Sequence, residues 1–510
     1  MISPGGRMGY LCSAVVALLA FSCNGACSVV AEREGASTEH CASACAVLSK
    51  SLPGKVTTAT NAAAYQKIQS GYYTTFNSEL APACFVLPTT AEDVGAVVTA
   101  AKEAQCPFAV KGGGHTFFAG ANSMQDGISI DLQQLNQVTV NDDGSASIGP
   151  GNRWGRVFET LDPLGLTVMG GRVSTVGVGG LLVSGGLSFL HPSQGLGVDN
   201  IRSYQLVNAD GMILEVSQDS HPDLFWALRG GGNNLGIVTR FDVNTVKHQN
   251  FWGGSINYNI SELEPLMKAY NRLAQPETQD PKATTWFAPV YFPKTGLWLI
   301  NTEPVYAEPV STTPEIFKPF MDSPNQLSNS VRITNISSLA QDTAAEAGST
   351  AAEWDITMKM NTEVVHYMRQ RIQDGAMDHP ALDTLSIPVQ ILGKTTLSHT
   401  TNRGGNALGL SESDGPLLIV QLALSWPAGT AAEDDEAIYA LGDALMKDVK
   451  QWSVERGLEH RYIYMNYAGR SQNVFEGYGE ENHARLRQVA RKYDPEGVFQ
   501  RLLPGGKKVF

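Results

Sequence analysis

Residues 108–123 read FAVKGGGHTFFAGANS, and this stretch decides the fold that the rest of the chain supports. A short apolar run leads into three consecutive glycines, Gly112, Gly113 and Gly114, and then directly into His115. Glycine lets the backbone approach a ligand closely, and successive N–H groups in such a turn bind anions. The pattern therefore predicts a phosphate-binding loop beside an imidazole, although a glycine run alone is also typical of an ordinary turn.

A second glycine-rich region, MGGRVSTVGVGGLLVSGG, covers residues 169–186 and has no charged residue after Arg172. Its glycines recur too often for a stable helix or strand core, so we expect irregular backbone that lies against a cofactor. On composition alone, a tightly packed internal turn is the alternative. A third glycine cluster covers residues 230–236 and precedes a strand predicted for residues 237–241.

The residues before the first loop predict a strand–helix–strand unit. Residues 83–87 are apolar, and Thr90 is a helix N-cap candidate that precedes valines at helical spacing over residues 91–104. Residues 107–110 form the next predicted strand and lead into the glycines. Order is expected to begin near Val56, because residues 32–55 are small and polar.

Alternating apolar residues or helical spacing predict the remaining elements. The predicted strands are 128–132, 138–140, 146–148, 204–206, 212–216, 285–292, 296–301 and 416–425, with a hairpin turn at Asp143-Gly144. The predicted helices are 156–161, 222–229, 262–274, 352–373 and 432–455.

In order along residues 80–245, these motifs resemble the flavin-binding domain of the vanillyl-alcohol oxidase/p-cresol methylhydroxylase (PCMH) superfamily, in its berberine-bridge-enzyme-like branch. The resemblance implies FAD carried by His115 through an 8α-histidyl bond. Lys111 stands where many members have arginine, which keeps a positive charge at that position. The residues that the resemblance places at the cofactor are His115, Lys111, Gly112, Gly113, Gly114, Thr116, Val173, Ser174, Val176, Gly177, Gly180, Gly236, Ile237 and Val238.

Two valines of the second glycine-rich region refine this expectation. Members of the branch with two covalent links have a cysteine at the position of Val173, and valine cannot form a thioether. We therefore expect one covalent bond, at His115, and no cysteinyl link. The residue at the position of Val176 is associated in this branch with access of O₂ to the flavin, and a valine there favours an oxidase over a dehydrogenase.

The segment RYIYMNY, residues 461–467, with Tyr478-Gly479 and a predicted helix over 480–492, resembles the closing element of the family, which begins with a Tyr-x-Asn-Tyr strand. Tyr467 is the first candidate catalytic base and Tyr464 the second, with Asn466 steadying flavin or substrate. A phenol has an ordinary pKa near ~10, so such a base needs a positive neighbour near neutral pH. Three ordinary residues of an aromatic strand are the alternative. Gly469 stands where an aspartate often follows Asn-Tyr in the family.

The expected fold class is α+β, in two domains and a returning C-terminal element. The divisions are a signal peptide over 1–31, a two-part PCMH-type FAD-binding domain over 56–250, an α/β substrate-binding domain with a helix-covered antiparallel sheet over 251–460, and a closing element over 461–510 that packs back onto the FAD domain.

The cysteines and the first residues indicate export. Arg7 precedes an apolar run over residues 10–21 that is typical of a signal peptide. Four cysteines beyond it predict two disulfides with three possible connectivities, namely Cys41, Cys45, Cys84 and Cys106. Cys41-x-x-x-Cys45 could instead be half of a zinc site, but no further cluster completes one, so no metal is expected. Sequons at Asn259 and Asn335 predict glycosylation in a secretory compartment.

Composition limits the function classes. The chain has 510 residues with 37 basic and 50 acidic side chains, a net charge of −13, which argues against binding nucleic acid or an anionic membrane. No GxGxxG motif after a strand, Walker loop, GxSxG or HExxH is present. With these classes excluded, the resemblance implies a secreted monomeric FAD-dependent oxidase that oxidises a small organic, secondary-metabolite alcohol and reduces O₂ to H₂O₂. The alternatives are an oligosaccharide oxidase, a dehydrogenase, and a flavoprotein scaffold without net redox chemistry.

Overall fold

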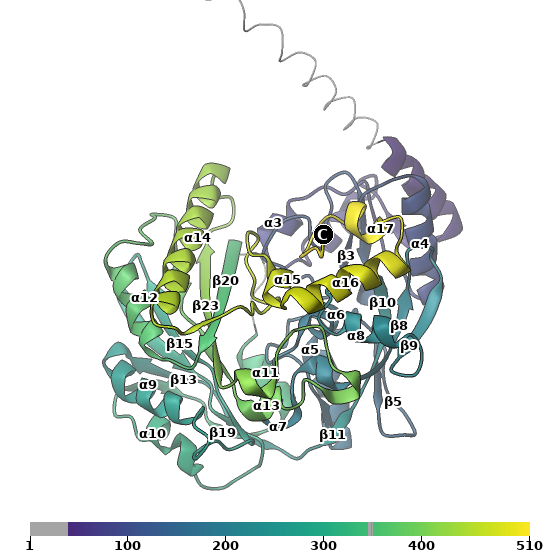
Figure 1. Cartoon of the computed structure of the whole chain (residues 1–510). Helices are drawn as coiled ribbons and strands as arrows, with labels where there is room; N and C mark the ends of the chain where they lie inside the picture. The colour runs from purple at the N-terminus through teal and green to yellow at the C-terminus, as the bar shows by residue number, and fades with distance from the viewer. Residues whose placement is uncertain (1–38, 345–347, 349) are drawn as a thin grey trace, which may run out of the picture.

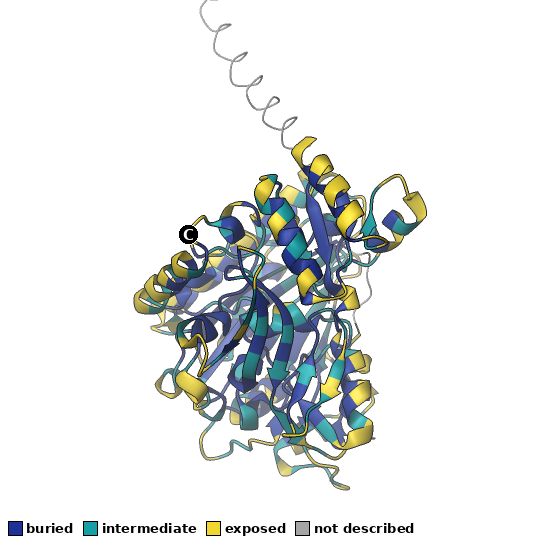
Figure 2. Ribbon diagram, turned by 90° about the vertical axis from the view of Figure 1, so that its right-hand side faces the viewer, coloured by how far each residue is buried: buried dark blue, intermediate teal, exposed yellow. Residues whose placement is uncertain are grey.

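The computed structural model describes residues 39–344, 348 and 350–510. The expected signal peptide over 1–31 lies outside the described residues. Two halves lie side by side, and the C-terminal segment runs from one half back onto the other (Figure 1). Buried residues fill the strands of both halves, and exposed residues gather on the outer sides of the helices (Figure 2). The α+β fold class is thus confirmed.

The first glycine loop is presented by a four-stranded sheet in the order β1-β2-β4-β3. Strands β2 (Cys84–Val86), β4 (Ile128–Asp131) and β3 (Phe108–Lys111) are parallel, and β1 (Val56–Thr57) is antiparallel to β2. Helix α4 (Ala91–Glu103) begins at a capping box in which Thr90 accepts a hydrogen bond from the backbone N–H of Asp93. The predicted strand–helix–strand unit is confirmed, and β3 leads the chain directly into the glycines.

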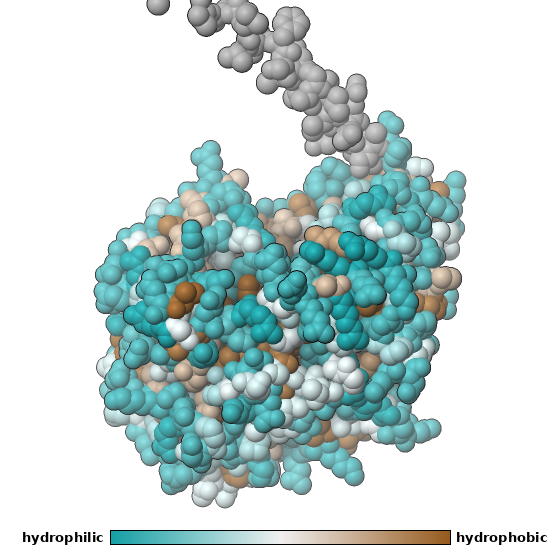
Figure 3. All heavy atoms as spheres, viewed as in Figure 1, coloured by the Kyte–Doolittle hydropathy of each residue, from teal (hydrophilic) through white to brown (hydrophobic). Residues whose placement is uncertain are grey.

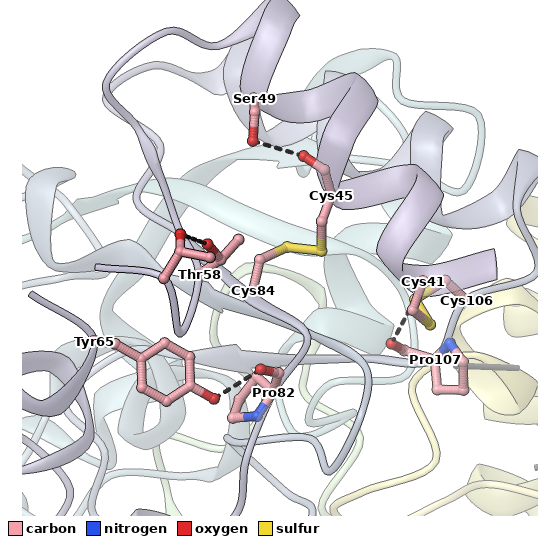
Figure 4. The surroundings of a disulfide bond; sticks show 10 residues. Cys41, Cys45, Ser49, Thr58, Tyr65, Pro82, Cys84, Cys106 and Pro107 are labelled. Atoms are coloured by element: carbon pink, nitrogen blue, oxygen red, sulfur yellow. Dashed lines mark hydrogen bonds between the residues drawn. A yellow bond between two sulfur atoms is a disulfide. The ribbon is translucent and has the colours of Figure 1, made fainter. Parts of the chain in front are cut away.

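The expectation that order begins near Val56 is wrong, because residues 39–51 form a helix. Leu48, Cys41 and Cys45 of this helix are buried against the first sheet, a burial that its polar composition concealed. Two disulfides fix the helix, Cys41–Cys106 and Cys45–Cys84 (Figure 4). This is one of the three connectivities that the sequence allowed.

Replacing Cys45 and Cys84 together with serine is expected to destabilise the protein by about 3–4 kcal/mol. The disulfide closes a loop with a sequence separation of 39 residues, and opening it returns conformational entropy to the unfolded chain. Guanidinium unfolding followed by circular dichroism measures the loss. A midpoint equal to that of the wild type would show that packing alone holds the helix.

The second sheet is antiparallel, in the order β5-β6-β10-β8-β9. Its strands are β5 (Val138–Val140), β6 (Ala146–Ile148), β8 (Ile201–Val207), β9 (Ile213–Ser217) and β10 (Ile237–Val243). The predicted hairpin between β5 and β6 is confirmed. Helices α5 (Trp154–Leu161) and α8 (Pro222–Leu228) share one hydrophobic core with buried residues of this sheet.

The second glycine-rich region contains one element that the composition did not predict. Residues of its second half form helix α6 (Val178–Ser184), where irregular backbone was expected. Val178 and Leu182 are buried in the core, one turn apart on the same side of the helix. Burial of this side therefore outweighs the cost of glycine in a helix, which is up to about 1 kcal/mol per residue.

The other half is built on a nine-stranded sheet, which we call the large sheet, and a separate four-stranded sheet in the order β14-β17-β12-β19. The strands of this smaller sheet are β14 (Ala283–Thr284), β17 (Val305–Tyr306), β12 (Phe251–Gly253) and β19 (Arg332–Thr334). The main strands of the large sheet are β13 (Ile256–Asn259), β15 (Phe287–Phe292), β16 (Leu297–Thr302), β20 (Thr350–Lys359), β21 (Thr384–Ser386), β22 (Val389–Leu392) and β23 (Leu417–Trp426). Helices α9 (Leu263–Arg272), α12 (Glu363–Gln373) and α14 (Ala432–Glu455) bury apolar residues in a core shared with one face of this sheet.

The predicted helix over 352–373 is wrong in its first half. Residues 350–359 form β20, and the helix begins only at Glu363. Trp354 and Ile356 lie in the hydrophobic core, whereas Glu353 and Asp355, one position earlier in each case, belong to the opposite face. This period of two is typical of a strand, and the alanines at its start gave a misleading impression of a helix.

The C-terminal segment packs back onto the first half. Residues 461–467 do not form the strand that the resemblance implied: they are irregular and end in a turn. Helices α16 (Glu480–Tyr493) and α17 (Val498–Arg501) follow, and Val498 and Phe499 are buried in the core of the first sheet. In the described part of the chain no helix is long and apolar enough to cross a membrane. The face shown in Figure 3 is mostly hydrophilic.

Candidate active site

A cavity of about 610 Å³ receives residues from both halves of the molecule. Both glycine-rich regions, one face of the large sheet and the segment around Tyr467 line it. Residues of the C-terminal tail, Gly506 and Lys507, complete the wall. The volume lies in the range of cofactor and ligand sites in proteins.

The two glycine-rich regions meet backbone to backbone. A Cβ atom added to Gly113 would lie 2.4 Å from the Cα of Gly177, and one added to Gly177 would lie 2.3 Å from the nitrogen of Gly113. Gly114 has φ of +74°, a conformation that side chains disfavour. The glycines therefore form one continuous wall of main chain along the cavity. The absence of side chains lets the two loops pack closely and lets a ligand approach their backbone.

His115 lies on this wall and is held on both sides. Its ring stacks on that of Tyr73 with centroids 3.9 Å apart, and its Nε2 lies 3.4 Å from the Thr175 hydroxyl. Burial, together with the nearby Arg153 guanidinium, lowers the pKa of His115 to about 4. The imidazole is thus neutral at physiological pH, and a ring nitrogen keeps a lone pair available for bonding.

The cavity brings together most of the residues predicted from the sequence. Those that line it are Gly112, Gly113, Gly114, His115, Thr116, Val173, Val176, Gly177, Gly180, Tyr464, Asn466 and Tyr467. Those that do not line it are Lys111, Ser174, Gly236, Ile237 and Val238. Ile237 and Val238 instead pair with β8 at the start of β10.

Lys111 does not supply the positive charge expected for the cofactor. Its ammonium group forms a buried ion pair with Asp131 at 2.9 Å and lies over the ring of Tyr72. The guanidinium closest to the glycine loop is that of Arg153, which donates to the carbonyl oxygens of Gly71 and Gly113 at 3.2 and 3.1 Å. Arg153 carried no signal in the sequence, because it lies 40 residues from Gly113.

Tyr467 has the positive neighbour that a phenol base requires. Its hydroxyl oxygen accepts hydrogen bonds from the Arg172 guanidinium at 3.2 Å and from the Gln390 amide at 2.9 Å, and Arg172 also donates to Gln390. Two donors, one of them positively charged, are thus aimed at a single oxygen in the cavity. These three residues, which we call the Tyr467 network, come from three distant parts of the chain.

Tyr464 is placed differently. Its hydroxyl oxygen accepts hydrogen bonds from the backbone N–H groups of Gly186 and Leu187 at 3.1 and 2.9 Å. Burial raises the pKa of Tyr464 well above its ordinary value. The hydroxyl therefore fixes the end of the second glycine-rich region, and of the two tyrosines Tyr467 is the better placed base.

Sequence reasoning missed the polar residues that the large sheet contributes to the cavity. Asn301, Glu353, Gln390 and Gln421 lie on four different strands and all line it. Gln390 in VQIL and Gln421 in LLIVQLAL are single polar residues within apolar runs, and that pattern is the signal that could have found these two. Asn301 and Glu353 lie in strands that contain other polar residues, so they carried no such signal.

Two observations fit this cavity to a large polar cofactor. Asn122 Oδ1, Glu353 Oε2 and Asn466 Nδ2 are buried at the cavity without a hydrogen-bond partner. Gly180 lines the cavity, and a Cβ added there would meet no atom within 4 Å, so its glycine keeps space free for something other than the protein. Among the described residues no cluster of His, Cys, Asp or Glu could hold a metal ion.

Comparisons with known proteins identify the cofactor. Residues 82–217 match the model of an FAD binding domain. The chain is 35% identical to the FAD-dependent monooxygenase sdcF of Emericella nidulans, over 91% of this chain and 98% of that protein. It is also 35% identical to the FAD-dependent monooxygenase FUP4 of Fusarium proliferatum, over 86% of this chain and 87% of that protein.

Solved structures show the same fold. The 6-hydroxy-D-nicotine oxidase of Arthrobacter nicotinovorans superposes with a TM-score of 0.74 at 21% identity, covering 90% of this chain and 98% of that one. The glucooligosaccharide oxidase of Acremonium strictum, described with a 6-S-cysteinyl, 8α-N1-histidyl FAD, superposes with a TM-score of 0.70 at 22% identity, covering 85% of this chain and 93% of that one.

Fold, site and relatives together define an FAD-dependent oxidoreductase. The chain belongs to the family of FAD-dependent oxidoreductases that includes the monooxygenases sdcF and FUP4, and the resemblance found in the sequence is confirmed.

Changing Gly180 to leucine is expected to abolish FAD binding while leaving the fold intact. The new side chain would project into open cavity space, and replacing a glycine within α6 by a better helix former stabilises the helix by up to about 1 kcal/mol. The absorbance ratio of flavin to protein in the purified enzyme measures the effect, with Gly180→Ala as the smaller control. A fully yellow Gly180→Leu variant would place the cofactor elsewhere.

Proposed function

We propose that this enzyme is an FAD-linked oxidase that converts an alcohol group of a small organic, secondary-metabolite molecule into a carbonyl group and reduces O₂ to H₂O₂. When bound, FAD would accept a hydride, which is a proton with two electrons, from the substrate carbon and would pass the two electrons to O₂. The observation that carries the proposal is the Tyr467 network, which aims two donors and one positive charge at a hydroxyl in the cavity.

In this proposal Tyr467 removes the proton of the substrate hydroxyl, and Arg172 stabilises the phenolate that receives it. Gln390 holds both partners in place, since it bonds to each of them. Per turnover the substrate loses one C–H hydride and one O–H proton, and O₂ gains two electrons and two protons. The overall reaction is therefore balanced as alcohol plus O₂ giving carbonyl plus H₂O₂.

We further propose that FAD is attached covalently to His115 alone. A neutral imidazole on the cavity wall supports this link, because an unprotonated ring nitrogen is needed to form the bond. Val173 lines the same cavity and has no sulfur, so a second link is not proposed. Glycine N–H groups of the first loop and the helix N-terminus of α6 would hold the phosphate groups.

Much of the cavity wall is aromatic or aliphatic, which favours a compact, largely apolar substrate over an oligosaccharide. Phe117, Phe118, Trp286, Leu187 and Val290 all line it. An oligosaccharide would require many hydrogen-bonding groups along an extended surface. The names of the relatives favour one second candidate, a monooxygenase, in which one oxygen atom of O₂ enters the product.

A panel of primary and secondary alcohols and oligosaccharides, supplied to the purified enzyme, tests the proposal. We expect H₂O₂ in a one-to-one ratio to carbonyl product, and bleaching of the flavin when the substrate is added without O₂. Turnover in labelled O₂ separates the candidates, because a monooxygenase would place the label in the organic product. Flavin that no alcohol bleaches would contradict the oxidase.

We propose a secretory or extracellular location for the enzyme. Its two disulfides form and persist in oxidising compartments, and Asn259 of one sequon is exposed at the end of β13. Glycosylation at Asn259 and Asn335, and a monomeric state, stay predictions. Digestion of the protein exported by its native host with an N-glycosidase tests the first of these.

A further inference from the structure

The cavity face of the large sheet holds a second polar group besides the Tyr467 network. In the register of β20 and β23, Glu353 lies opposite Ala423, and Asp355 lies opposite Gln421. Glu353, Gln421 and Ala423 all line the cavity. The small side chain of Ala423 leaves open space beside Glu353, so a bound molecule can reach the carboxyl group.

The Glu353 carboxyl has no charged partner of opposite sign. Its Oε2 is buried without a hydrogen-bond partner, and none of the ion pairs in the described residues includes it. The groups that face it are Asp355 on its own strand, Tyr73, and Gln421 on β23, whose side chain is within hydrogen-bonding reach of the carboxyl group and leaves Oε2 as the unpartnered oxygen. The positive charge of Lys507 opposes the rise in the pKa of Asp355. Asp355 also accepts a hydrogen bond from the backbone N–H of Tyr464 at 2.8 Å.

Burial, with the neighbouring Asp355, raises the pKa of Glu353 well above its ordinary value, and burial raises the pKa of Asp355 to about 8. The uncharged carboxylic acid is therefore favoured at Glu353, and its O–H group is a donor. Such a group left without an acceptor is costly, so a ligand that supplies one is stabilised by the match.

We propose that Glu353 determines which substrates bind, as an uncharged acid that donates a hydrogen bond to a carbonyl oxygen of an uncharged organic molecule. The proposal rests on the proposed function, because it concerns the same cavity. A cationic amine is disfavoured since the Arg172 guanidinium lies in that cavity. A carboxylate is disfavoured because taking its charge out of water is costly and the Arg172 guanidinium already donates to Tyr467 and Gln390.

Three probes of similar size test this in the FAD-loaded enzyme: acetophenone, benzylamine and benzoate. Their dissociation constants follow from the change that each causes in the flavin absorbance. We expect acetophenone to bind best, Glu353→Gln to keep its affinity within about threefold because the amide still donates, and Glu353→Leu to weaken it about tenfold. Acetophenone affinity should fall at alkaline pH in the wild type but not in Glu353→Gln.

Three results would overturn the proposal. In the first, benzylamine binds best and loses affinity in Glu353→Gln. In the second, benzoate binds better than acetophenone, or none of the three probes binds; in the third, Glu353→Leu and the wild type bind acetophenone equally well. Glu459→Gln, an exposed position on β24 (Glu459–His460) of the same sheet, is the matched control. Infrared difference spectra between wild type and Glu353→Gln give a readout without any ligand, because a protonated carboxyl must disappear.

The FAD content of the purified protein separates a failure of the proposed function from a failure of the role proposed for Glu353. A purified wild type without FAD contradicts the proposed function and the role of Glu353 together. Variants that carry normal FAD and oxidise alcohols, but bind acetophenone like the wild type, contradict only the role of Glu353.

Discussion

Replacing Tyr467 with phenylalanine is expected to lower kcat by about 10²–10⁴-fold while leaving the FAD content unchanged. The change removes the one hydroxyl that both Arg172 and Gln390 address and leaves the aromatic ring in place. Steady-state kinetics with the best alcohol of the panel, and the rate of anaerobic flavin bleaching, measure it. A Tyr467→Phe enzyme with normal bleaching would remove Tyr467 from the chemistry.

Two further variants show whether the loss is chemical. Arg172→Gln keeps a hydrogen-bond donor beside the Tyr467 hydroxyl but removes the positive charge, so we expect it to lower kcat and to leave the FAD content unchanged. Tyr464→Phe leaves the N–H groups of Gly186 and Leu187 without their acceptor. We expect it to cost about 1–3 kcal/mol of stability and to affect kcat far less than Tyr467→Phe.

Replacing His115 with alanine is expected to abolish covalent attachment completely. After acid denaturation the wild type should keep its yellow colour on the peptide that contains residue 115, and the variant should release any flavin into the supernatant. The stacked Tyr73 ring loses its partner, so a reduced affinity for FAD is expected as well. Colour that stays with the peptide chain of the variant would place the link at another residue.

The neutral imidazole also predicts how the rate of covalent FAD attachment varies with pH. The folded-state pKa of His115, about 4, lies below its ordinary value, so the neutral form that can bond dominates down to about pH 5. Attachment of FAD to the apoprotein should therefore proceed at similar rates between about pH 8 and pH 5 and slow only as the pH approaches 4. An attachment rate that halves near pH 6.5 would indicate an exposed histidine of ordinary pKa.

The parts of the site that could be predicted were those encoded locally. The first glycine loop, His115 and the strand that precedes them are consecutive, so one stretch of sequence specified them. The Tyr467 network could not be found in this way, since Arg172 and Gln390 lie 295 and 77 residues from Tyr467. Only the pairing of strands and the return of the C-terminal segment bring them together.

Other differences arose where burial outweighed local preference. Helix α6 forms among glycines because one side of it is buried, and the helix over 39–51 forms because two disulfides and the first sheet hold it. Lys111 matched a family position, yet its charge is neutralised by Asp131, which lies on the neighbouring strand β4. The residues that pack against these helices, and Asp131, are distant in the sequence from the segments that they stabilise, so local sequence patterns could not reveal them.

The wall of the cavity joins residues that are far apart in the sequence, because Tyr73 and His115 share it with Gly506 and Lys507. A chain whose residues 506 and 507 have not yet returned to the first half therefore lacks part of the receptacle for FAD. The order of events in maturation follows from this, because the nucleotide can be fully enclosed only once that return is made.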